Sequence, residues 1–421
     1  MKHIFCLVVV ACLVSAGLGQ AFEAPVEERA ETNGPRRSLD LGVNEFGISF
    51  GNSPRWAGLR FNLMDEGVER VSGVNLTFWK PRKNPDAIIN GIAAGLLASA
   101  GDEINGISFG GLAVIATSRI SGIAVGGLAV VSEGSSNGIS IGGLASVAEG
   151  DITGISAGGL ASVVEGSITG MSVGGLASVT EGIITGMSVG GLASVAEGIF
   201  TGISVGGLAS VANGGFTGFS VGGLASVSNG DVYGITIGGL AAVANASLSG
   251  ISASGLATVA DGGLSGIAVS GGGVSSSSDI SGIAVGVIGM INTPGTRVED
   301  SELNSWLSYV GIAAENARGL TVHGIDVDIE RQLAGLGIGG ITVRAGSIAG
   351  AALASVLVKA HDVRGFSAGA VTYFDECQVG LAIGIVNYAE RLNGIQLGLV
   401  NIAKNQARYA RVLPLVNAHF E

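Results

Sequence analysis

The sequence predicts an all-β fold, a parallel β-solenoid of about twenty 14–16-residue coils with capped ends. Three observations predict it: a 16-residue period through the middle of the chain, short alternating apolar runs inside each repeat, and the equivalence of successive repeats. A fixed period this short is typical of one small unit stacked on copies of itself.

Each repeat begins with Gly and a large apolar residue. The regular repeats begin at Gly106, Gly122, Gly138, Gly154, Gly170, Gly186, Gly202, Gly218, Gly234, Gly250, Gly266 and Gly282. More divergent repeats begin at Gly58, Gly73 and Gly91, and again at Gly319, Gly335, Gly350, Gly365, Gly380 and Gly394.

The pattern inside a repeat indicates strands and turns. In the repeat at Gly202, Ile203 and Val205 alternate along an extended segment, and Asn213-Gly214 marks a turn. Gly, Ser, Val and Ile are poor helix formers, so each coil is expected to hold two or three short strands. Strands ~4.8 Å apart would give a stack of roughly 95 Å.

An outer-membrane β-barrel is the alternative. Alternating apolar residues and the near-terminal Phe420 favour it. In a barrel, however, successive strands run in opposite directions, which predicts a doubled period and aromatic girdles across the repeats. Glu149 and Glu165 instead occupy the same place in consecutive repeats, which favours the solenoid.

The composition divides the chain into segments. Lys2 and His3 precede an apolar run, as in a secretory signal, and residues 40–90 are rich in aromatic residues, as expected of a cap. The predicted segments are a signal peptide 1–21, a flexible leader 22–39, an N-terminal cap with divergent coils 40–90, the regular solenoid 91–292, an insertion loop 293–318, divergent coils 319–405 and a C-terminal cap 406–421.

Charge and cysteine content limit the function. The net charge is −12, and residues 101–290 contain one basic residue, Arg119, which argues against nucleic acid as a partner. Loss of the signal would leave Cys377 as the single cysteine, so no intramolecular disulfide is expected. Export without disulfides favours a bacterial cell surface, outer membrane or periplasm.

Two catalytic motifs match the sequence by their residues but lack the structural context that each of them requires. The Gly-x-Ser-x-Gly pattern of hydrolases recurs around Ser108, Ser140, Ser156, Ser172, Ser188, Ser204 and Ser220. A nucleophile elbow needs one strained Ser between a strand and a helix, so seven copies are a by-product of the repeat. Gly335-x-Gly337-x-x-Gly340 matches a dinucleotide fingerprint, but no helix pattern follows it.

Two side-chain columns are candidate binding sites. The stacked carboxylates of Glu149, Glu165, Glu181 and Glu197 are weak candidates for Ca²⁺, although a solvated turn column is the preferred interpretation. The binding-face candidates are Thr153, Thr169, Thr185, Thr201 and Thr217. Regular Thr arrays suggest ice binding, but no strand here presents Thr-x-Thr.

A further polar group is expected in the C-terminal coils. Glu330, His361, Glu376 and Arg391 share one turn column, and His361 and Glu376 could be neighbours across one rung. A His–carboxylate pair can act in acid–base chemistry, but a surface ion pair is the preferred interpretation.

The C-terminal stretch contains motifs that are similar to those of a known protein family. The segments GLAIGIVNYAERLNGIQLGLVNIAKN (380–405) and VLPLVNAHF (412–420) resemble a family of uncharacterised bacterial surface-repeat proteins. The resemblance implies export and envelope association, and it brings no catalytic residues.

The sequence therefore predicts an exported, non-enzymatic surface-repeat protein without a cofactor. Its mechanism would be multivalent adhesion or binding along a repetitive face, with a glycan, another protein or another surface ligand as partner. Association with the outer membrane and lateral self-association are further expectations, and an ice- or cation-binding solenoid is the second alternative.

Overall fold

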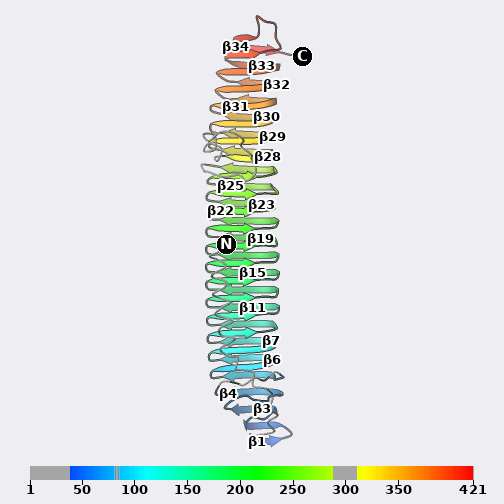
Figure 1. Cartoon of the computed structure of the whole chain (residues 1–421), viewed down its shortest axis with the longest axis vertical. Coiled ribbons are helices and arrows are strands. Elements are labelled where there is room, and N and C mark those ends of the chain that lie inside the picture. The colour runs from blue at the N-terminus through cyan, green and yellow to red at the C-terminus, as the bar shows by residue number, and fades with distance from the viewer. Residues whose placement is uncertain (1–37, 80, 82–83, 85, 288–310, 421) are drawn as a thin grey trace, which may run out of the picture. The chain divides into compact units, whose positions relative to one another are not determined.

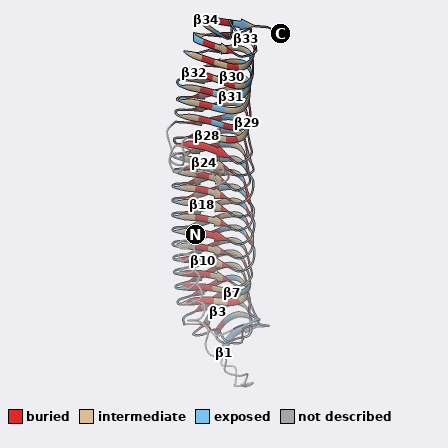
Figure 2. Ribbon diagram, turned by 45° about the horizontal axis from the view of Figure 1, so that its top comes forward, coloured by how far each residue is buried: buried red, intermediate tan, exposed pale blue. Residues whose placement is uncertain are grey.

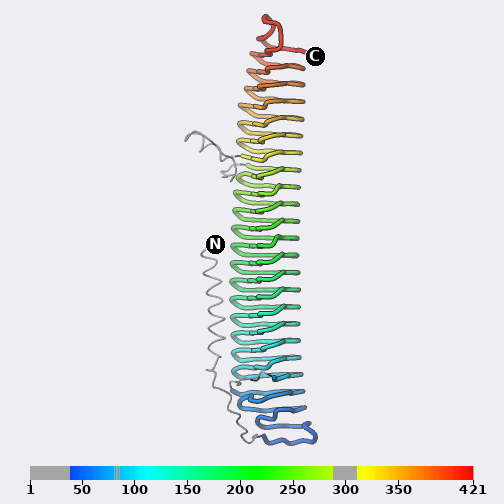
Figure 3. The backbone as a smooth tube through the Cα atoms, turned by 45° about the vertical axis from the view of Figure 1, so that its right-hand side comes forward, coloured from blue at the N-terminus to red at the C-terminus, as the bar shows by residue number. Residues whose placement is uncertain are grey.

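Each regular coil consists of one long strand, one short strand and two tight turns. The computed structural model describes residues 38–79, 81, 84, 86–287 and 311–420, and these residues form strands and no helix. β11 (Ile152–Gly158) is followed, after Gly159 and Leu160, by β12 (Ala161–Val164). A second turn, residues 165–167, leads to β13 (Ile168–Gly174), one coil further along (Figure 3).

The coils stack in parallel and in register. β11 pairs with β13 so that Thr153 lies beside Thr169, and β12 pairs with β14 (Ala177–Thr180) so that Ser162 lies beside Ser178. Each side chain therefore lies next to its counterpart in the following repeat. This confirms a β-solenoid of about twenty coils, and the antiparallel alternative does not occur in the described regular coils.

The chain forms two compact units, residues 1–211 and 212–421. Figure 1 labels many of their strands. The other strands of the first unit are β1 (Ser38–Val43), β2 (Phe46–Gly51), β3 (Arg55–Asn62), β4 (Arg70–Thr77), β5 (Ile88–Gly95), β6 (Ala98–Gly110), β7 (Ala113–Gly126), β8 (Ala129–Ser132), β9 (Ser135–Gly142), β10 (Ala145–Ala148), β15 (Ile184–Gly190), β16 (Ala193–Ala196) and β17 (Phe200–Gly206), followed by β18 (Ala209–Ala212).

The second unit continues the pattern of long and short strands and then changes to longer strands. Its strands are β19 (Phe216–Gly222), β20 (Ala225–Ser228), β21 (Val232–Gly238), β22 (Ala241–Ala244), β23 (Ser247–Ser254), β24 (Ala257–Ala260), β25 (Gly263–Ser270), β26 (Gly273–Ser276), β27 (Asp279–Gly286), β28 (Ile312–His323), β29 (Asp326–Gly339), β30 (Thr342–Ala354), β31 (Leu357–Ala368), β32 (Val371–Ile383), β33 (Val386–Ala403) and β34 (Val412–His419).

Strand direction reverses at the two described ends of the chain. β1 is antiparallel to β2, and β34 is antiparallel to β33, whereas β2 and β3 are parallel. An antiparallel end strand covers the open edge that a solenoid would otherwise present. The predicted signal 1–21, the leader up to residue 37 and residues 293–310 of the predicted insertion lie outside the described residues, while residues 312–318 form the start of β28.

The core lies between the long and short strands and is narrow. In the coil of β11 and β12, Ile152, Ser156, Ser162 and Val164 are buried, whereas Thr153 and Ile155 are exposed. Buried and exposed positions alternate in this way along the strands (Figure 2). Strand side chains alternate between two faces, so each coil supplies only a few inward positions. Large residues occur mainly in the column of Ile152, and the other columns are small or polar.

Serine hydroxyls form a zigzag chain through the core of the first unit. Ser172 Oγ donates to Ser162 Oγ at 2.9 Å and also bonds Ser178 Oγ at 2.8 Å. Ser188 in turn donates to Ser178 at 3.0 Å. The continuous chain is Ser146, Ser156, Ser162, Ser172, Ser178, Ser188, Ser194, Ser204 and Ser210. Every buried hydroxyl in it therefore has a partner, which avoids the cost of an unpaired polar group.

A column of glycines brings neighbouring coils into close contact. Gly154 and Gly170 have φ values of 127° and 135°, which side-chain-bearing residues rarely adopt. A Cβ atom on Gly170 would lie 2.1 Å from the carbonyl oxygen of Gly154. The repeat therefore needs Gly here for two reasons, backbone conformation and contact with the next coil.

We expect Gly170→Ala to lower the free energy of unfolding by more than Gly263→Ala. Gly263 also has a positive φ, 127°, but its added Cβ would meet its nearest atom at 3.5 Å. Gly263→Ala therefore carries the conformational cost of a side chain at positive φ, about 1–2 kcal/mol, without the clash. Chemical denaturation followed by circular dichroism measures both, and equal losses would show that coil-to-coil contact is not what selects Gly.

We expect Ser178→Ala to lower the free energy of unfolding by about 1–3 kcal/mol, because the hydroxyls of Ser172 and Ser188 lose a buried partner. Ser265→Ala, at an exposed position, should change it by less than about 0.5 kcal/mol. The same denaturation experiment compares the two variants. A Ser178→Ala protein as stable as the control would contradict a stabilising hydroxyl chain.

Candidate functional site

The serines of the Gly-x-Ser-x-Gly patterns lie in the core. Ser108, Ser140, Ser156, Ser172, Ser188, Ser204 and Ser220 are at most 3% exposed. Those in the first unit bond other serines, as Ser108 does with Ser99 and Ser140 with Ser136. Each of them occupies a continuous strand rather than a strand-to-helix turn. Their hydroxyls thus satisfy one another across the core and do not face solvent.

The acidic column forms one edge of the first unit. Glu149, Glu165, Glu181 and Glu197 are exposed in successive turns, and their backbone N–H groups bond the preceding coil. The predicted alignment is therefore present in the structure. In the described part of the chain, no three His, Cys, Asp or Glu side chains are grouped so that they could hold a metal ion. Calcium binding by this edge stays a prediction.

In the second unit the corresponding turns carry an amide ladder. Asn229 Nδ2 donates to Asn213 Oδ1, and Asn245 Nδ2 donates to Asn229 Oδ1, each at 2.7 Å. An amide both donates and accepts, so identical side chains can bond along the stack. The substitution of Asn for Glu therefore replaces repulsion between like charges with hydrogen bonds.

The predicted threonine column lies on the outer surface of the long strands. Thr153, Thr169, Thr185 and Thr201 are exposed, and their register follows directly from the pairing of β11, β13, β15 and β17. Thr217 is exposed in the same position of β19 in the second unit, where Tyr233 succeeds it. The structure thus places all five predicted threonines at equivalent outward positions.

Two apolar columns accompany the threonines on the same surface. In the first unit we name this surface the threonine–isoleucine face, and it comprises the outward side chains of β9, β11, β13, β15 and β17 together with the equivalent ones of β6 and β7. Its first apolar column is Ile107, Ile123, Ile139, Ile155, Met171, Met187 and Ile203, and its second is Phe109, Val125, Ile141, Ala157, Val173, Val189 and Val205.

The three columns of the threonine–isoleucine face are exposed or half-buried and carry no charge, and the outward Glu103 of β6 and Arg119 of β7 lie at their border. Ile107, Phe109, Ile123, Ile141, Ile155 and Ile203 are 36–47% exposed. No Asp, Glu, Lys or Arg occurs among the outward side chains of β9, β11, β13, β15 and β17. A leucine column that includes Leu144, Leu160 and Leu176 continues the apolar surface around the adjoining turn. Sequence analysis found the threonines but missed these apolar neighbours, although their alternation was visible.

The polar group of the C-terminal coils differs from the prediction. His361 Nδ1 lies 2.7 Å from Asp375 Oδ1, so the partner of His361 is Asp375 and not Glu376. A register shift lies between Ala360 and Asp362 in the pairing of β31 with β32, and it changes which carboxylate faces the histidine. The imidazole is 63% exposed, as in a surface ion pair.

A second ladder that the sequence analysis missed lies beside this pair. The rings of Tyr373 and Tyr388 stack at 4.7 Å between the ammonium groups of Lys359 and Lys404. Lys404 Nζ also lies 2.7 Å from Glu390, and this hydrogen bond raises the pKa of Lys404 and lowers that of Glu390. Cation–π contact, ring stacking and ion pairing thus join side chains from four successive coils.

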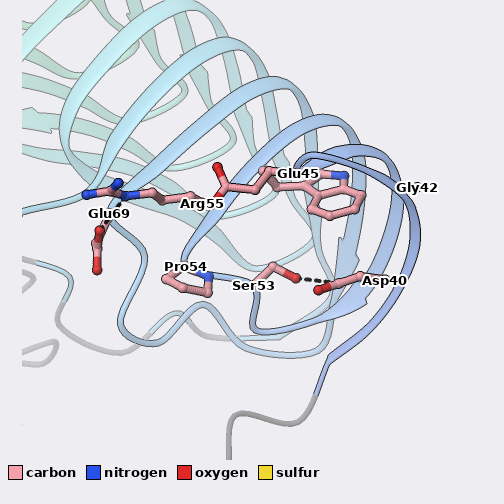
Figure 4. Close-up of a pocket in the computed structure, with 8 residues that line it drawn as sticks. Asp40, Gly42, Glu45, Ser53, Pro54, Arg55 and Glu69 are labelled. Atoms are coloured by element: carbon pink, nitrogen blue, oxygen red, sulfur yellow. Dashed lines mark hydrogen bonds and ion pairs between the residues drawn. The ribbon is translucent and has the colours of Figure 1, made fainter.

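A polar pocket of about 490 Å³ opens at the N-terminal end of the first unit (Figure 4). Asp40 accepts hydrogen bonds from Ser49 at 2.6 Å and Ser53 at 2.7 Å, and Arg55 pairs with Glu69 at 2.7 Å. Burial raises the pKa of Asp40, but the serine hydroxyls outweigh it and the net pKa is lowered. Asp40, Arg55 and Glu69 of the pocket thus already have protein partners.

A buried charge lies in the same N-terminal coils. Arg60, fully buried, donates to Asp65 and to Asn75, the latter at 2.8 Å, and Asn62 and Thr77 also donate to Asp65. Hydrogen bonding to several donors stabilises a carboxylate inside a protein. This network fixes the first coils, where the hydroxyl chain of the regular repeats has not yet begun.

Comparison with known proteins adds no family. No protein-family model matches the chain, and no curated protein and no solved structure is significantly similar to it. Among the described residues there is no helix of the length and hydrophobicity needed to cross a membrane.

We expect the free energy of unfolding to fall between about pH 7.5 and 5.5 because of buried His323. Its Nδ1 accepts the N–H groups of Ile325 and Asp326, and Nε2 lies 3.3 Å from the carbonyl oxygen of Gly272. Burial lowers the pKa of His323, so the unfolded chain binds more protons as the pH falls through about 6.5 and folding loses stability.

Denaturation at a series of pH values measures this dependence, with His323→Gln as the comparison. The variant should show a flatter slope over the same window, whatever its absolute stability. An identical slope in both proteins would assign the pH dependence to other groups.

Proposed function

We propose that this chain is an exported, non-enzymatic structural protein that binds multivalently through its threonine–isoleucine face. The observation that carries the proposal is the face itself, which repeats one uncharged pattern of Thr, Ile or Met, and Val in coil after coil. Exposed apolar surface that extends over many residues marks sites of association.

The mechanism is the addition of weak contacts. One coil offers a Thr hydroxyl and two apolar side chains, which bind little alone. A planar or repetitive partner meets the same group again in each following coil, at the ~4.8 Å spacing of neighbouring strands. Binding at one coil raises the effective concentration of the partner at the next, so the affinity grows with the number of coils.

Export is supported by the sequence. The N-terminal run of apolar residues after Lys2 is typical of a secretory signal, and the C-terminal motifs resemble those of bacterial surface-repeat proteins. A cell-surface, outer-membrane or periplasmic location would place the face next to envelope polymers or neighbouring proteins.

The test compares two double variants of equal charge. Ile155→Lys with Ile203→Lys, the face variant, places charges on the threonine–isoleucine face. Val163→Lys with Val195→Lys, the control variant, places them on the outer surface of β12 and β16. Adsorption to planar methyl-terminated and hydroxyl-terminated surfaces is followed with a quartz-crystal microbalance.

We expect the face variant to desorb from the methyl-terminated surface at least about 10-fold faster than the unmodified protein. The control variant should desorb at a rate similar to that of the unmodified protein. Deletion of residues 154–185, two whole repeats that leave Thr153 followed by a Gly, should also shorten the residence time. Equal loss in both double variants would contradict a dedicated face.

A further inference from the structure

The threonine–isoleucine face is larger than the apolar patches that soluble monomers usually expose. Its exposed Ile, Phe and Thr side chains, with the half-buried Met and Val beside them and the leucine column at its border, present roughly 1,000 Å² in the first unit. The largest patch on a typical monomer is about 300–600 Å². A stable protein interface buries about 800 Å² on each partner. The face therefore has the area of a complete interface.

The chemistry of the face disfavours lipid as its partner. Proteins that lie on membranes carry Trp and basic residues around their apolar surface. The described coils from β6 to β17 contain neither Trp nor Lys and only one basic residue, Arg119, and their charged edge is acidic. Anionic lipid would be repelled by that edge.

The face is complementary to itself. A second copy presents the same columns at the same strand spacing, so apolar columns of one copy can lie between those of the other across a two-fold axis. Pairing brings no like charges together on the face, because Glu149, Glu165, Glu181 and Glu197 lie at the turn beside it. Those carboxylates would form the solvated rim that is typical of protein interfaces.

We propose that the occupant of the threonine–isoleucine face is the same face of a second copy of this chain, in a two-fold symmetric dimer. The proposal rests on the proposed function, since it names the partner of that binding face. The two long-strand sheets would lie about 10 Å apart, the usual distance of packed sheets. Met171 and Met187, in the first apolar column of the face, can adapt their side chains to the opposing column. The threonine hydroxyls would bond across the interface.

Sedimentation velocity of residues 22–421 at concentrations from about 0.1 to 50 µM tests the proposal. The unmodified protein and the control variant are expected to sediment as dimers at about 10 µM, and the face variant as a monomer, with its dimer dissociation constant raised at least about 100-fold. Circular dichroism of each variant verifies that it is folded. A monomeric unmodified protein over the whole range would overturn the dimer, as would a face variant that dimerises like the control.

The outcomes separate this inference from the proposed function. A monomeric protein whose adsorption to the methyl-terminated surface still depends on Ile155 and Ile203 would overturn the dimer and keep the binding face. A monomeric protein whose adsorption depends on neither Ile155 nor Ile203 would overturn both the dimer and the binding face. Flotation of the protein with phosphatidylcholine vesicles, lost in the face variant, would overturn the dimer in favour of a lipid partner.

Discussion

The backbone hydrogen bonds between successive coils impose one constraint, from which the side-chain columns, the core and the outer face all follow. Leu160 N donates to Leu144 O and Leu176 N donates to Leu160 O, each at 2.7 Å, and equivalent bonds recur from coil to coil within each unit. These bonds fix the register, so a residue type that recurs with the repeat forms a column. The glycine column belongs to the same constraint, because a side chain on Gly170 would separate it from Gly154.

The same constraint explains a core that contains so much serine. A coil with a long and a short strand encloses a narrow space, and Ile152 or Phe200 fills one part of it. The remaining inward positions are opposite each other at a distance that two hydroxyls span, as Ser172 and Ser178 do. Each serine thus meets partners in its own and the next coil, and the polar core stays satisfied. Coils with Ala124 and Val130 instead use an apolar pair at these positions.

Because the coils are in register, a side chain that faces outward in one coil recurs in the next coils and forms a column on the surface. A single exposed Ile would be ordinary on a protein surface, but a column of them beside a column of threonines becomes a continuous uncharged sheet face. The carboxylates gather at one turn for the same reason, and at the corresponding turn of the second unit the Asn213, Asn229 and Asn245 ladder replaces repulsion with hydrogen bonds. An amphipathic cross-section is repeated along the stack, which is why the binding proposal and the dimer both concern a face and not a pocket.

The repeat, its strand-and-turn character, the parallel stacking and the alignment of the glutamates and threonines could all be predicted from the sequence, because a strict period leaves one register. Which columns point inward could be seen only in the folded structure. It placed the serines of the Gly-x-Ser-x-Gly patterns in the core and the isoleucines outside, since the two turns set where each strand enters the coil. It also showed that His361 pairs with Asp375 and not with the predicted Glu376. The reason is that the period changes from 16 residues to 14 or 15 in those coils, and a register shift accompanies this change. The shorter spacing is visible in the sequence, but the residue at which the register shifts is not.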